Sequence, residues 1–133
     1  MSALSPSDQE AILEAAVDLF DTGRFLAAHE LFEELWEATE GEDADFFKGL
    51  LQASVALHHL QAGNAEGARR LHGSHRALLA RYQPVHLGLE VSRFLEAMRS
   101  LFRAAPESSG ADARTEGFPR LGPRRDPGDT AAR

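Results

Sequence analysis

The sequence predicts an all-α protein, a compact bundle of about five antiparallel helices built from helical hairpins and followed by a disordered C-terminal tail. Apolar residues recur every three or four positions in five segments, which is the period of one helix face. No segment alternates apolar and polar residues over the length of a strand, so no sheet is predicted. Glycine or proline separates the segments, and such short links favour antiparallel neighbours.

The first two helices are expected to form one hairpin. Ser5-Pro6-Ser7 opens the first helix, because a hydroxyl group can cap the first turn, and Gly23 ends it. The second helix is predicted from about Arg24 to Thr39 and ends before Gly41. The predicted buried residues are Ile12, Leu13, Ala16, Val17, Leu19, Phe20, Ala28, Leu31, Phe32 and Leu35.

Three further helices follow. The third, residues 43–61, is the most apolar and is expected to be central. Gly63-Asn64 separates it from a fourth helix over about 65–81, which Pro84 terminates. A fifth is predicted over about 89–104, so residues 1–105 form a single helical domain. His72, His75 and His86 are interpreted as a solvated or half-buried set without a functional role.

The segment 106–133 differs in composition from the helices. It is rich in glycine and proline, and Phe118 and Leu121 are its large apolar residues. Such a segment buries too little apolar surface to offset the entropy lost on ordering. We therefore expect a flexible tail.

Composition narrows the class of protein. A chain of 133 residues with 43% hydrophobic and 26% charged residues is typical of one soluble domain. The chain has no cysteine, which excludes disulfides and thiolate metal sites. The sequence shows neither a signal segment nor an apolar stretch of the roughly 20 residues that span a bilayer, so a cytoplasmic location without membrane contact is expected.

Charge is divided between the two halves of the helical region. Residues 1–45 carry thirteen acidic side chains and only Arg24, whereas residues 46–105 carry eight basic and three acidic side chains. One interpretation is that the two halves neutralise each other within the fold. The alternative is an anion-binding strip made by Arg69, Arg70, Arg76 and Arg81. Aromatic residues are not interleaved with these arginines, so nucleic acid is a disfavoured partner.

The stretch AHELFEELW, residues 28–36, holds the candidate site. Helical spacing places His29 and Glu33 on one stripe with Trp36, and Glu30 on the neighbouring stripe. His58 lies on the third predicted helix, beside an apolar seam. Antiparallel packing is therefore expected to bring His29, Glu33 and His58 together.

This segment, with KGLLQASVALHHLQAGN (48–64) and Gly67-Ala68, resembles the family called domain of unknown function 309, and the likeness covers about residues 12–82. The resemblance implies a small all-helical cytoplasmic prokaryotic protein with no established activity. The family pattern maps onto His29, Glu30, Glu33, Trp36, Gly49, Gln52, Ala56, His58, Gly63 and Asn64.

Three interpretations of the cluster stay open. His29, Glu33 and His58 supply donors that suit zinc, iron or manganese, so a divalent metal is a possible cofactor. The same groups suit a buried polar network beneath Trp36, or a pocket for a small polar ligand with Gln52 nearby.

Three functions follow from these interpretations. The favoured one is a non-enzymatic binding or scaffolding module that self-associates through its hairpins. The second is a metal-dependent hydrolase with Glu30 as the general base, which leaves the question of an enzyme open. The third is a binder of an anionic ligand or nucleic acid through the arginine strip.

Overall fold

The computed structural model of the chain describes residues 4–104 and 118–124. Four long helices lead the chain: α1 (Pro6–Asp21), α2 (Phe25–Ala38), α3 (Asp43–Gln61) and α4 (Ala65–Leu79). They are followed by the short helix η1 (Ala80–Tyr82), the strands β1 (Val85–His86) and β2 (Leu89–Glu90), and α5 (Val91–Ala104). The predicted all-α class and its five helices are confirmed.

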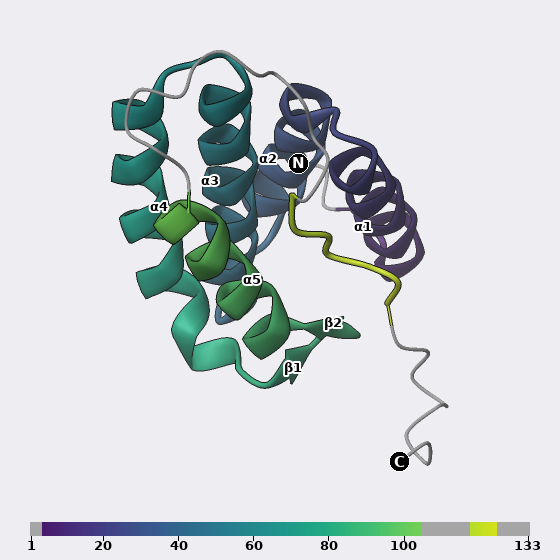
Figure 1. Ribbon diagram of the computed structural model, residues 1–133. Helices are drawn as coiled ribbons and strands as arrows, with labels where there is room; N and C mark the ends of the chain where they lie inside the picture. Colours follow the sequence, from purple (N-terminus) through teal and green to yellow (C-terminus); the bar gives the residue numbers. More distant parts are fainter. Residues whose placement is uncertain (1–3, 105–117, 125–133) are drawn as a thin grey trace.

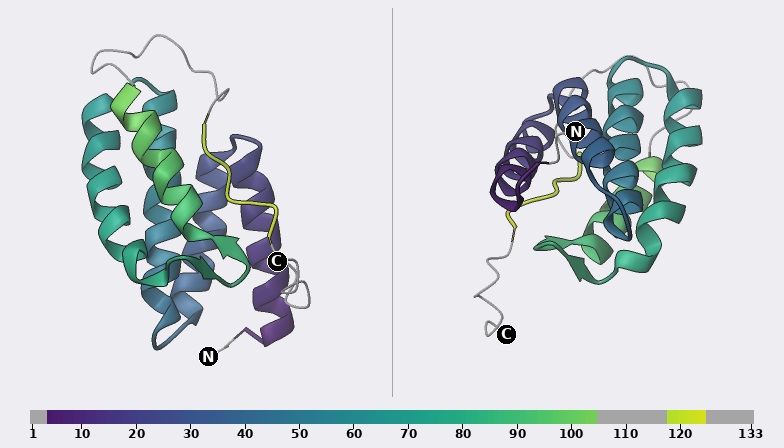
Figure 2. Two further views of the ribbon diagram at one scale, coloured as in Figure 1. Left: turned by 60° about the horizontal axis from the view of Figure 1, so that its bottom comes forward. Right: turned by 180° about the vertical axis from the view of Figure 1, so that it is seen from behind.

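The four long helices stand side by side in a curved row, and each packs against the next (Figure 1). The helix α5 crosses the concave side of this row, where it contacts α4. Residues 118–124, which we call the strap, run along the gap between α1 and α5 (Figure 2). In the described ranges no helix is long and apolar enough to cross a membrane.

The helix boundaries follow from local chemistry. The Ser5 hydroxyl accepts a hydrogen bond from the backbone N–H of Asp8 at 3.0 Å, as expected for an N-cap. The Asn64 side chain caps α4 in the same way by accepting from the N–H of Gly67 at 3.0 Å. Gly41 and Gly63 have φ values of 96° and 86°, and glycine adopts such values without steric cost where the chain turns.

A small hairpin corrects the prediction that the chain has no sheet. The strands β1 and β2 pair antiparallel, with Val85 opposite Glu90 and His86 opposite Leu89. The turn between them contains Leu87 at φ 50° and Gly88 at φ 80°, a geometry typical of tight two-residue hairpins. Strands of two residues are too short to show the alternation on which a sequence prediction depends.

Close packing of α3 on α4 depends on Gly49. A Cβ atom at this position would lie 2.7 Å from both Cγ and Cδ2 of Leu79, which is itself fully buried. Any larger residue must therefore displace the buried Leu79 side chain. Gly49, one of the residues that carry the family resemblance, thus has a packing role.

The position of His75 corrects the prediction that it is solvated or half-buried. Its side chain is fully buried, and His72 Nδ1 lies 3.2 Å from His75 Nε2. The His72 ring stacks on Phe102 of α5 at a centroid distance of 4.2 Å. The arrival of α5 on α4 covers the His75 ring completely and the His72 ring in part.

Burial lowers the pKa of His75 to about 3. Electrostatic repulsion from Arg76, and from His72 once it is protonated in acid, lowers this pKa further. The pKa of His72 falls to about 4, chiefly through burial and then through Arg76, Arg69 and Arg99. Both imidazoles are therefore neutral in the folded protein at pH 7. The Nδ1 atom of His75 is buried without a hydrogen-bond partner in the described part of the chain. This favours the tautomer in which Nε2–H donates to His72, because it leaves a lone pair unpaired at Nδ1 rather than an N–H group.

Residues 118–124 depart from the predicted flexible tail. Leu121 is buried, and its backbone N–H and that of Gly122 donate to the Asp21 carboxylate at 2.7 and 3.0 Å. The strap is ordered by partners on α1, which composition does not reveal. The remainder of the segment 106–133 lies outside the described residues.

We predict that Gly49→Ala destabilises the protein by about 1–3 kcal/mol, because the added methyl group collides with Leu79. Gly73→Ala on α4 is the matched control, since a Cβ there meets nothing within 4 Å and alanine favours a helix. Urea unfolding followed by circular dichroism measures both. Equal effects of the two substitutions would contradict the packing role of Gly49.

We also predict that acid destabilises the fold through His75. The folded state keeps this imidazole neutral down to about pH 3, whereas the unfolded chain takes up a proton below its ordinary pKa of 6.5. Stability is therefore lost as pH falls from about 6.5 towards 3, by about 2 kcal/mol at about pH 5 from this residue. Urea unfolding of wild type and His75→Met between about pH 7 and about pH 5 tests this, and the variant should show a shallower dependence.

Candidate functional site

The outer face of the α2–α3 hairpin carries the predicted site residues. His29, Glu33 and Trp36 are partly exposed on α2, and Gln52 is partly buried on α3. The Nε2 atom of His29 lies 3.9 Å from Oε1 of Glu33, and the two side chains are 27% and 43% exposed. This pair lies at the surface, so it is not a buried polar network.

Lys48 was not among the predicted site residues and belongs to the same face. Its Nζ lies 5.7 Å from the centre of the Trp36 ring, within the range of a cation–π contact. The antiparallel pairing of the two predicted helices was the one signal in the sequence that could have indicated this contact. We call His29, Glu33, Trp36, Lys48 and Gln52 the hairpin face.

Gln52 carries an unpaired acceptor. Its Oε1 is buried and has no hydrogen-bond partner among the described residues. A buried carbonyl oxygen without a donor is unfavourable by roughly 1–3 kcal/mol. This acceptor lies beneath the hairpin face rather than on its exposed surface.

His58 does not complete the predicted metal site. Within the described ranges no group of three or more His, Cys, Asp or Glu side chains is placed to hold a metal ion. The reason is the register of the hairpin, in which Trp36 faces Lys48 and the Gln61 amide donates to the Gly23 carbonyl at 3.3 Å. His58 is consequently level with Leu26, about one helical turn from the level of His29.

The neighbouring ring of His58 is that of His59, at a centroid distance of 6.0 Å. His59 in turn lies 3.3 Å from the Asn64 side chain, at the start of α4. The two histidines thus belong to the end of the α3–α4 hairpin rather than to the centre of the hairpin face.

Glu30 is exposed on α2, on the side away from the core, together with Glu34 and Glu37. A general base must lie within hydrogen-bonding reach of a bound substrate. Glu30 lines neither the cavity beside the strap nor the groove between α4 and α5. The role predicted for Glu30 as a general base therefore gains no geometric support.

The four arginines of the predicted strip have separate roles. Arg69 donates to the Phe102 carbonyl at 3.4 Å, and Arg70 lies 3.9 Å from Glu66. Arg81 donates to the Tyr82 hydroxyl at 2.7 Å and to the Glu42 carbonyl at 3.2 Å, which ties η1 to the α2–α3 loop. Arg76 lines a shallow groove with Arg99 of α5. The four arginines thus make contacts with different parts of the molecule and do not form one continuous strip.

His86 and Asp43 form a second pair that the sequence did not indicate. His86 Nε2 lies 2.8 Å from Asp43 Oδ1, and the His86 ring packs edge-on against Phe46 at 4.7 Å. The pair joins the β-hairpin to the start of α3. No local pattern links two positions so distant in the chain.

We predict that Glu33→Gln changes the free energy of unfolding by less than about 0.5 kcal/mol, because partly exposed pairs one helical turn apart contribute little. Glu66→Gln, which removes a similar pair with Arg70, is the matched control. Thermal and urea unfolding measure both variants. A loss above about 2 kcal/mol for Glu33→Gln alone would instead indicate a buried network.

The comparisons with known proteins concern the same helices. Over 96 residues, or 70% of this chain, it is 34% identical to the uncharacterized protein YpuF of Bacillus subtilis (strain 168). Over 64 residues it is 34% identical to an uncharacterized protein of Aquifex aeolicus (strain VF5). The matches cover 55% and 19% of those proteins, so the chain spans about half of the first and less of the second.

The family model described as Domain of unknown function (DUF309) matches residues 13–71. This range contains all of α2 and α3, and therefore the whole hairpin face. The resemblance stated from the motifs is thus confirmed over residues 13–71.

Proposed function

We propose that this protein is a non-enzymatic helical binding module that self-associates, with the acidic outer side of α2 as one contact surface. The supporting observation is that the motif residues form an open polar face on paired helices. Beside them, Glu30, Glu34 and Glu37 are exposed on successive turns of α2. Such a surface suits a cationic polypeptide surface better than a small substrate.

The basic surface that would complement the acidic side of α2 lies on other helices of the molecule. Exposed arginines lie on α4, at the opposite end of the helical row from α1, and on α5, which crosses the concave side of the row (Figure 1). They are Arg70, Arg76, Arg93, Arg99 and Arg103. Because the acidic and basic surfaces are on different helices, the acidic side of one copy can face the basic side of another.

Polar groups of the hairpin face would give the contact specificity. The partly exposed His29 imidazole can donate or accept a hydrogen bond, and the partly exposed Glu33 carboxylate can accept one. An arginine from a second copy supplies the planar array of donors that such acceptors and carboxylates bind.

The proposal predicts that Glu30→Lys/Glu34→Lys/Glu37→Lys abolishes self-association, because it reverses the charge of the acidic surface. Sedimentation velocity across a wide range of protein concentration, at about 20 mM and about 500 mM NaCl, should show wild-type oligomers that dissociate in high salt. The same change of charge on α1, Asp8→Lys/Glu14→Lys/Asp18→Lys, should leave the oligomers intact. A wild-type protein that is monomeric in low salt would overturn the proposal.

A further inference from the structure

The strap is bound to the helices in the manner of a peptide ligand. Residues 118–124 have no helix or strand, yet they contact both ends of α1 and the tip of the β-hairpin. The strap lies between α1 and α5 in each view (Figures 1 and 2). Its binding site is therefore a groove between two helices.

The centre of the groove recognises backbone. Both carboxylate oxygens of Asp21 are used, because Oδ1 accepts from the N–H of Leu121 at 2.7 Å and Oδ2 from the N–H of Gly122 at 3.0 Å. Burial nevertheless raises the pKa of Asp21, while the two N–H donors act in the opposite direction. A partly buried carboxylate held against two consecutive amides is a specific device for holding an extended chain.

Side chains of the strap on either side of the Asp21 contact add contacts that depend on sequence. The Phe118 ring packs on Phe25 at a centroid distance of 5.9 Å, and Leu121 is 5% exposed. The fit at Gly122 is tight, since a Cβ there would lie 3.0 Å from Asp21 Oδ2 and 3.1 Å from Val17 Cγ1. The groove thus selects an aromatic residue, a leucine and a glycine at fixed spacing.

The far end of the groove selects an arginine. Two guanidinium nitrogens of Arg124 bind the two carboxylate oxygens of Glu10, and its Nε donates to the Leu87 carbonyl at 3.0 Å. The hydrogen bond from Arg124 lowers the pKa of Glu10. A bidentate arginine pair carries geometric specificity as well as charge.

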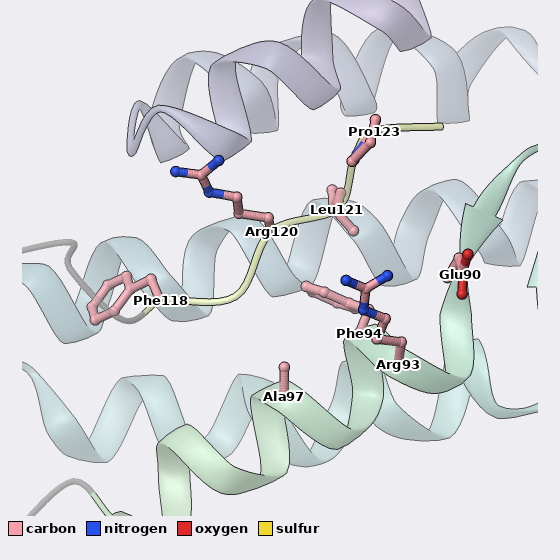
Figure 3. Close-up of a pocket in the computed structure, with 9 residues that line it drawn as sticks. Glu90, Arg93, Phe94, Ala97, Phe118, Arg120, Leu121 and Pro123 are labelled. Atoms are coloured by element: carbon pink, nitrogen blue, oxygen red, sulfur yellow. The ribbon is translucent and has the colours of Figure 1, made fainter. Parts of the chain in front are cut away.

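The strap does not fill the space between α1 and α5. A cavity of about 430 Å³ remains beside it, with Phe94 and Ala97 on the α5 side and Leu121 on the strap side (Figure 3). Arg93 extends from α5 towards the strap in this view, whereas Arg120 extends away from α5. The groove therefore has room for an occupant bulkier than the strap.

We infer that this groove is a docking site for an extended, arginine-containing segment of a partner protein, and that the strap occupies it as an internal competitor. Charge supports this occupant, because the α1 side of the groove carries the carboxylates of Glu10 and Asp21, while the α5 side carries one charge of each sign, Glu90 and Arg93. The strap is covalently tethered through residues 105–117, so its local concentration is high and a partner must displace it. The site is separate from the hairpin face and does not depend on the proposed self-association.

A peptide competition experiment on the full chain tests this inference. The probe is a fluorescein-labelled amidated peptide with the sequence of residues 118–124, FPRLGPR, and the readout is fluorescence anisotropy. Leu121→Asp and, separately, Arg124→Glu weaken the strap without altering the groove. Each variant should bind the peptide about tenfold or more tightly than wild type, because the internal competitor is released. Agreement between the two variants guards against a folding defect in either.

Two controls make the experiment specific for the groove. A scrambled peptide, RGPLFRP, has the same composition and should not bind. Adding Glu10→Arg to the Leu121→Asp variant should reverse the preference, so that the Arg124→Glu version of the peptide binds more tightly than the original. Equal binding to wild type and both strap variants, or equal binding of the scrambled peptide, would overturn the inference. A wild-type dimer that Leu121→Asp abolishes would also overturn it, in favour of strap exchange between copies.

Discussion

The burial of Phe94 at the centre of the molecule is the contact on which the rest of the structure depends. Its ring packs edge-on against Phe20 of α1 at 5.7 Å and lies 6.1 Å from the His75 ring of α4. One residue of α5 therefore joins the first and fourth helices of the row. Without it, the apolar concave side of a row of helical hairpins would face water.

This arrangement explains why polar residues on the two sides of the row behave differently. On the concave side, α5 covers His72 and His75, which are neutral and bound to each other. On the outer side nothing in the described part of the chain covers the hairpin face, so His29 and Glu33 remain partly exposed. Histidines therefore stabilise the fold on the concave side, whereas on the outer side a histidine and a carboxylate are exposed to solvent.

The strap partly fills the gap that α5 leaves beside α1. A single helix cannot cover the concave side of four helices, and the space between α1 and α5 is filled partly by the strap and partly by a cavity. The Asp21 carboxylate holds backbone rather than side chains at this point. Such a contact orders a segment of poor apolar content, because it binds the backbone rather than particular side chains.

The sequence by itself determined the helices, because each depends on local chemistry that a reader of the chain can see. Ser5 and Asn64 cap their helices, Gly41 and Gly63 adopt the positive φ values of the turns, and apolar residues recur at the helical period. It also placed His29, Glu33 and Trp36 on one side of one helix, which the structure retains. The hairpin of β1 and β2 was missed because its strands are too short to show a pattern.

Only the tertiary structure decided which side chains meet. The register of α2 against α3 brings Lys48 rather than His58 to the motif, and it depends on contacts at both ends of the hairpin. The burial of His75 depends on α5, and the order of the strap depends on a carboxylate about 100 residues earlier in the chain. Such long-range contacts leave no periodic pattern in the sequence. Each of them joins two segments that are far apart in the chain and that fold locally without reference to each other.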